Sequence, residues 1–106
     1  IVISVNGFTG HGNADDAIKM SEEDDGHVLG LIADAVLTGN GGVGIVLEEE
    51  DAGDVYAVVS AVTTAGNDDG ELGLEVVQED AGAGELTLVG SNITDGIEVE
   101  GASLRD

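Results

Sequence analysis

The tetrapeptide Glu-Asp-Ala-Gly occurs twice in this chain of 106 residues, at residues 50–53 and 79–82. Each copy lies between two runs rich in Val, Leu and Ile, "IVLEEEDAGDVYAVV" and "LEVVQEDAGAGELTLV". A constant offset of 29 residues superimposes the two stretches, and it matches Ile45 with Leu74 and Leu47 with Val76. A related structural unit is therefore expected to occur twice.

Each unit has the pattern of a strand, an acidic turn and a second strand. We interpret the two units as β-hairpins, near residues 43–60 and 72–90. Gly53 and Gly82 are expected to supply the positive φ that such a turn needs. Carboxylates beside these glycines keep the turn hydrated and discourage pairing between sheet edges.

The fold class predicted from this pattern is mainly β, a small β-sandwich or barrel. Apolar and polar residues alternate in "GELTLVG" and "GIEVEG", as in strands with one aqueous face. Two repeats are too few to predict a solenoid. We expect a single β-rich domain over residues 13–106, preceded by an N-terminal strand or arm over residues 1–12.

Two stretches near the N-terminus allow more than one interpretation. Residues 14–20 could form a short helix capped by Asn13, or an extended arm. Residues 28–38 have helical spacing of apolar residues, but Gly30 and the β-branched content favour two short strands.

The charge balance indicates the salt concentration in which the protein works. Twenty-three Asp and Glu residues face only two Lys or Arg residues, and the net charge is −21. Such a surface repels itself in dilute buffer, whereas at about 1 M salt the Debye length falls to roughly 3 Å and the repulsion is screened. We therefore expect a protein of multi-molar salt, from a halophilic archaeon or one of its viruses. An acidic mesophilic protein or a designed sequence is the alternative.

Composition also limits the partners. Two cationic side chains cannot neutralise a nucleic-acid backbone, so nucleic acid is not an expected partner. No apolar stretch is long enough for a membrane-spanning helix, so membrane insertion is not expected either. The chain has no cysteine and therefore neither a disulfide nor a thiolate metal site.

Candidate sites are few. The cluster Asn67, Asp68, Asp69 and Glu71 places oxygen ligands beside a glycine, as calcium loops do, but it lacks the EF-hand spacing, and a solvated turn is the alternative. No cofactor is expected apart from calcium or other salt cations. His11 and His27 lack metal-ligand spacing.

Nucleophile and phosphate-loop motifs are absent, so no catalytic residue is assigned and an enzyme is not expected. Asn92 begins an Asn-Ile-Thr glycosylation sequon, which matters only outside a cell.

The stretches "GVGIVLEEEDAGDVYAVVS" and "LGLEVVQEDAGAGELTLVG" resemble the small capsid decoration, or cement, proteins of tailed viruses. The resemblance extends over residues 43–100 and concerns the pattern of short strands and turns of the Glu-Asp-Ala-Gly type. It implies a non-enzymatic structural protein at the virion surface, here of a halophilic virus. Its expected partners are further copies of itself, commonly as a trimer, and the major capsid protein.

The same resemblance implies an N-terminal arm that pairs with a neighbouring subunit. The edge-strand residues expected to do so are Ile1, Val2, Ile3 and Val5. Their alternative role is an ordinary internal strand. The alternative function is a surface or secreted binding module of a halophilic archaeon, perhaps calcium-dependent.

Overall fold

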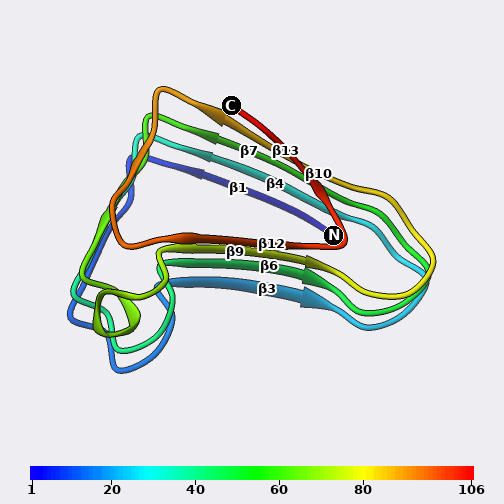
Figure 1. Cartoon of the computed structure of the whole chain (residues 1–106), viewed down its shortest axis with the longest axis horizontal. Helices are drawn as coiled ribbons and strands as arrows, with labels where there is room; N and C mark the ends of the chain where they lie inside the picture. The colour runs from blue at the N-terminus through cyan, green and yellow to red at the C-terminus, as the bar shows by residue number, and fades with distance from the viewer.

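Every strand in this chain pairs with the strand one coil earlier or later, and every pairing is parallel. The computed structural model describes residues 1–106. The chain winds through three strands per coil for about four coils and forms a parallel β-solenoid (Figure 1). The prediction of a mainly β protein is confirmed, whereas the prediction of a sandwich or barrel is wrong.

The coils stack their strands into three sheets. Sheet A contains β1 (Val2–Asn6), β4 (Val28–Ala33), β7 (Val55–Ser60), β10 (Gly84–Val89) and β13 (Ser103–Arg105). Sheet B contains β2 (Thr9–His11), β5 (Val36–Thr38), β8 (Thr63–Ala65) and β11 (Asn92–Ile93). Sheet C contains β3 (Ile18–Glu22), β6 (Ile45–Glu49), β9 (Leu74–Gln78) and β12 (Ile97–Glu100). A 3₁₀ turn, η1 (Asp68–Gly70), lies between β8 and β9.

The 29-residue offset is the register between two coils. Ile45 in β6 pairs with Leu74 in β9, and Ile18 in β3 pairs with Ile45 at an offset of 27 residues. Both strands that flank each Glu-Asp-Ala-Gly turn do exist, but β6 lies in sheet C and β7 in sheet A, so they do not pair with each other. The prediction of β-hairpins near residues 43–60 and 72–90 is therefore wrong. Alternation of apolar residues is the same in a hairpin and in a stacked coil, so it could not distinguish the two folds.

No α-helix forms near the N-terminus. Residues 14–17 are loop, and Ile18 begins β3, because every second side chain from Ile18 onwards turns into the solenoid. The short helix is thus the wrong alternative. The stretch 28–38 forms β4 and β5. Residues 1–12 contribute β1 and β2, which pair with β4 and β5 as part of the first coil.

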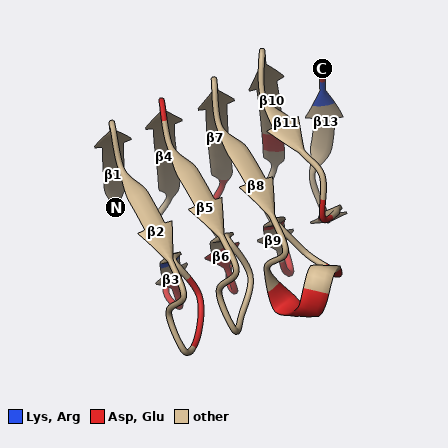
Figure 2. Cartoon of the chain, turned by 90° about the vertical axis from the view of Figure 1, so that its left-hand side faces the viewer, with Lys and Arg blue, Asp and Glu red and all other residues tan.

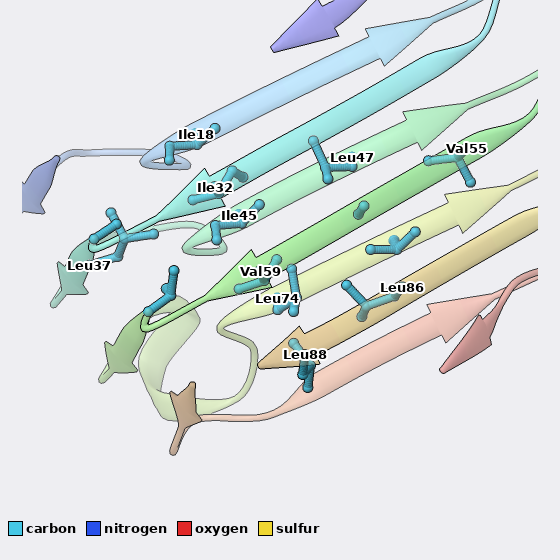
Figure 3. Close-up of a cluster of buried hydrophobic side chains, with 14 of the residues drawn as sticks. Ile18, Ile32, Leu37, Ile45, Leu47, Val55, Val59, Leu74, Leu86 and Leu88 are labelled. Carbon is cyan, nitrogen blue, oxygen red and sulfur yellow. The ribbon is translucent and has the colours of Figure 1, made fainter. Parts of the chain in front are cut away.

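The core lies inside the coils and is aliphatic (Figure 3). Equivalent positions of successive coils stack similar side chains, such as Ile18, Ile45 and Leu74 in sheet C. Ile45, Leu47 and Leu74 are fully buried. Burial of one such side chain contributes about 1.5–3 kcal/mol, so each added coil extends the core and the ladders together.

The corner between sheets A and B needs a left-handed residue in every coil. Gly7, Asp34, Ala61 and Gly90 occupy it, with φ values of 74°, 53°, 53° and 58°. The last coil differs at the corner between sheets C and A, because it has no acidic turn there. β13 returns directly to sheet A, where Ser103 pairs with Glu85. β13 therefore covers part of the C-terminal end of the solenoid.

Candidate assembly surface

The outer faces of the three sheets differ in charge, because side chains alternate between the core and solvent along each strand. On β1, β4 and β7 of sheet A most outward positions are apolar, and these three strands contain no Asp or Glu (Figure 2). The outward apolar residues of sheet A are Val2, Leu29, Leu31, Ala33, Tyr56, Val58 and Val89. We call this surface the sheet A face. It is an unpaired apolar surface on a highly acidic protein.

The sheet A face has no net charge. Its only ionic residues are Glu85 on β10 and Arg105 on β13, whose side chains lie 3.4 Å apart and form an ion pair. A shallow depression of about 120 Å³ also lies on this face, beside Leu31 and Val58. The rest of its outward side chains are Ser, Thr and Asn.

The outer face of sheet C is acidic. Glu48, Glu75, Glu98 and Glu100 point outward there, with Lys19 as the one cation. Partial burial, followed by the nearby charges of Glu98 and Glu48, raises the pKa of Glu75. The repulsion among these carboxylates favours the protonated form and weakens the fold when salt is low.

The corner between sheets C and A holds three stacked acidic turns: Glu22–Gly26, Glu49–Gly53 and Gln78–Gly82. We call it the acidic corner. Glu49 is fully buried, and its carboxylate accepts hydrogen bonds from the backbone N–H groups of Asp51 (3.0 Å) and Gly53 (3.1 Å). Its Oε2 also accepts a hydrogen bond of 2.8 Å from Gln78. The first acidic side chain of the turn therefore has a structural role, and the later ones are solvated.

Two carboxyl groups of the acidic corner, those of Glu50 and Asp51, have a raised pKa. Desolvation by the neighbouring coils, followed by the carboxylate of Glu48, raises the pKa of Glu50. Desolvation, followed by the charge of Asp80 one coil away, raises the pKa of Asp51. The stacking of coils brings like charges together at this corner, and salt screens their repulsion.

Gly53 and Gly82 are needed for a reason that the sequence did not suggest. Neither has positive φ. A Cβ on Gly53 would clash with the carbonyl oxygen of Gly26, and a Cβ on Gly82 would clash with that of Gly53. The expectation of positive φ is therefore incorrect, and close stacking of one turn on the next explains these glycines.

The proposed calcium residues do not converge. Asn67 is fully buried in a ladder, where its Oδ1 accepts a hydrogen bond of 2.8 Å from Asn40 and its Nδ2 donates one of 2.7 Å to Asp95. Asp68 and Asp69 lie in η1, and Asp69 and Glu71 are exposed. No group of three or more His, Asp or Glu side chains comes together in a metal-binding arrangement.

The remaining predicted residues lie at the surface. β1 pairs only with β4, so Val2, Ile3 and Val5 are on an edge strand of sheet A, with Ile1 just before it. Ile1 and Val2 are exposed, whereas Ile3 and Val5 pack partly against the core. Asn92, in β11, is exposed.

The histidines lie on different elements. His11, at the end of β2, contacts the backbone and hydroxyl of Thr38 through its Nδ1. His27 follows the first acidic turn, and its Nδ1 accepts a hydrogen bond of 2.9 Å from the backbone N–H of Asp54. The two histidines do not face each other, and both have structural contacts.

Two sequence signals for this architecture were missed. Gly-Asn occurs at residues 12–13, 39–40 and 66–67, at a strict spacing of 27 residues. A third acidic turn, "EEDDG", lies at residues 22–26. Together they reveal three repeats where only two were recognised. The sheet A face could have been found by writing the outward positions of these repeats beneath one another.

No protein-family model, curated protein or solved structure matched this chain. None of its helical segments has the length and apolar character needed to span a membrane. The functional interpretation therefore depends on its own residues.

Proposed function

We propose that this chain is a non-enzymatic structural protein of a halophilic virus particle, which decorates the particle surface and works in multi-molar salt. The observation that supports this proposal is the separation of charge between faces. The acidic corner and the face of sheet C hold dense carboxylates, whereas the sheet A face is apolar and has no net charge.

This separation suits a protein that docks on a large assembly in brine. Exposed apolar patches of this kind are typical of interaction surfaces. Carboxylates on the other faces stay hydrated and keep the assembled subunits soluble, while salt screens their repulsion. A stiff solenoid presents both faces on one rigid unit, because each coil is bonded to the next along all three sheets.

A second candidate is a surface or secreted module of a halophilic archaeon. The exposed position of Asn92, which begins a glycosylation sequon, favours it. The acidic faces serve the same purpose in this setting. Glycosylation of Asn92 in the native protein would support this candidate, because the sequon is used only outside a cell.

The distinguishing experiment is co-sedimentation at about 3 M KCl, where surface charges are screened. The chain is mixed with stripped particles of the virus whose genome encodes it, or with the envelope of the host. We expect binding to the particles and not to the envelope. Binding to the envelope alone supports the second candidate, and binding to neither contradicts both. Removal of residues 1–8 tests whether the edge formed by Ile1, Val2, Ile3 and Val5 takes part.

A further inference from the structure

The sheet A face exposes large apolar side chains at its centre. Tyr56 and Val58 lie at its centre, on β7, and are 44% and 37% exposed. Leu31 lies beside Val58 on β4 and is 40% exposed. The face of sheet B is also free of Asp and Glu, but its strands have only two or three residues and its outward positions are mostly polar. Of these two faces, sheet A offers the wider surface for packing.

A second copy of this chain has a surface that suits this face. Two chains with a net charge of −21 repel each other in most orientations. Contact with the face of sheet C or with the acidic corner would press carboxylates against Leu31 and Val58 and strip their hydration. Contact between two sheet A faces brings apolar side chains together at the centre, and the only carboxylate on each face, Glu85, is paired with Arg105. A two-fold axis produces this contact, since the same patch then meets itself.

The size of the face agrees with such a pair. Five strands at about 4.8 Å spacing and six residues at about 3.3 Å rise cover roughly 24 by 20 Å, or about 500 Å². Two copies would then bury about 1,000 Å² in total, which is near the lower limit for a specific interface. The pair is therefore expected to be reversible and to depend on protein concentration.

The shape of the face also suits contact with itself. Tyr56 is its largest exposed side chain. The depression of about 120 Å³ lies two residues further along the strands, beside Val58. A two-fold axis between the two features places each Tyr56 over the depression of the other copy.

We propose that two copies of this chain pack their sheet A faces together around a two-fold axis, with Tyr56 at the centre. This inference rests on the proposed function for the salt at which the pair forms. A paired chain covers its sheet A face, so pairing and particle binding through that face compete. Sheet-on-sheet packing about 10 Å apart accommodates the side chains of both faces. A closed pair results, in contrast to the trimer that the resemblance implies.

The test is the mass by light scattering in about 3 M KCl, over protein concentrations from about 10 µM to about 1 mM. The wild type is expected to approach twice its 10.6 kDa chain mass as concentration rises. Val58→Asp buries a charge in the pair and should weaken association at least about tenfold. Val36→Asp is the matched control, because Val36 is 45% exposed on the face of sheet B. It should pair like the wild type.

Tyr56 gives a second readout that does not depend on a variant. It is the only tyrosine, and the chain has no tryptophan, so its fluorescence reports on this face alone. Quenching by acrylamide should decrease as the pair forms. Circular dichroism on each variant separates loss of pairing from loss of folding, and Tyr56→Ser weakens pairing without adding charge.

A wild type that stays monomeric to about 1 mM overturns the inference. So does equal loss of pairing in the Val58 and Val36 variants, or a mass that grows beyond two copies. Pairing without binding to virus particles leaves the inference intact and contradicts the proposed function. Particle binding by a chain that stays monomeric contradicts the inference and leaves the proposed function intact.

Discussion

Asn40 and Asn67 lie one coil apart in the solenoid, and the side-chain amide of Asn40 donates a hydrogen bond of 2.8 Å to the side-chain oxygen of Asn67. The backbone N–H of Asn40 donates to the same oxygen at 3.2 Å. Asn13 makes the same two contacts with Asn40, and Asp95, which accepts only, ends the ladder. A parallel stack of identical amides satisfies both the side chains and the turn backbone, and it fixes the register of the coils.

Asn40→Ala should therefore destabilise the protein by about 3 kcal/mol, because it leaves several buried groups without partners. Asn6→Ala is the control, since Asn6 is exposed and should change the free energy of unfolding by less than about 0.5 kcal/mol. Urea denaturation at high salt measures both. Equal values for the two variants would mean that the ladder does not stabilise the fold.

Gly53→Ala should be more harmful than Gly26→Ala. A Cβ on Gly53 meets a backbone carbonyl of the previous coil, which cannot move without breaking the stack, whereas a Cβ on Gly26 meets the carboxyl end of Glu22 at 2.8 Å. We expect a cost of about 1–3 kcal/mol for Gly53→Ala and a smaller cost for Gly26→Ala, because Glu22 can change rotamer. Thermal unfolding of the two variants in parallel tests the order, and the reverse order would contradict the stacking described for the acidic corner.

Ala61→Gly should stabilise the protein. Ala61 has a φ of 53° at a corner where other coils use Gly7 and Gly90. Glycine removes the left-handed strain but adds chain entropy to the unfolded state, so we expect a net gain of about 0.5–1 kcal/mol and a melting temperature several degrees higher. Ala52→Gly has no such strain to relieve and should lower the melting temperature or leave it unchanged. A lower melting temperature for Ala61→Gly would contradict this corner geometry.

Stability at low salt should rise as the pH falls from about 7 towards 5. The pKa values of Glu50, Asp51 and Glu75 are all raised in the folded state, by desolvation first and then by neighbouring carboxylates. The folded protein therefore binds more protons than the unfolded chain. This contribution is fully present below the unfolded pKa values and is lost as the pH rises through the raised ones.

Calorimetric scans across this pH range, at low salt and at about 3 M KCl, measure the effect. The dependence of the melting temperature on pH should be weaker at high salt, because salt screens the repulsion between neighbouring carboxylates that contributes to the raised pKa values. The double substitution Glu50→Gln and Asp51→Asn should weaken this dependence at low salt. A melting temperature that falls steadily from pH 7 to 5 would contradict the assignment.

The strands were predictable from alternation, and the parallel stacking was not. Ile45 and Leu74 match in the sequence, but the match alone does not show whether the two residues belong to two hairpins or to two coils. The insertion of η1 changes the coil length from 27 to 29 residues and hides the third repeat. The Gly-Asn pairs at a spacing of 27 residues carried the missing information.

The candidate surface was also only partly predictable. The acidic character of the turns follows directly from the composition. The sheet A face depends on three-dimensional stacking, because Leu31 and Val58 become neighbours only when β4 and β7 pair. The buried role of Asn67 was missed because its sequence neighbours are acidic and typical of a solvated turn.

We propose that this solenoid folds and assembles in brine through a face that has no net charge. The most direct measurement combines circular dichroism with mass by light scattering, from low salt to about 3 M KCl. We predict a chain that gains β structure and stability with salt and then associates as concentration rises. A β-rich monomer that is equally stable at all salt concentrations and never associates would contradict the account.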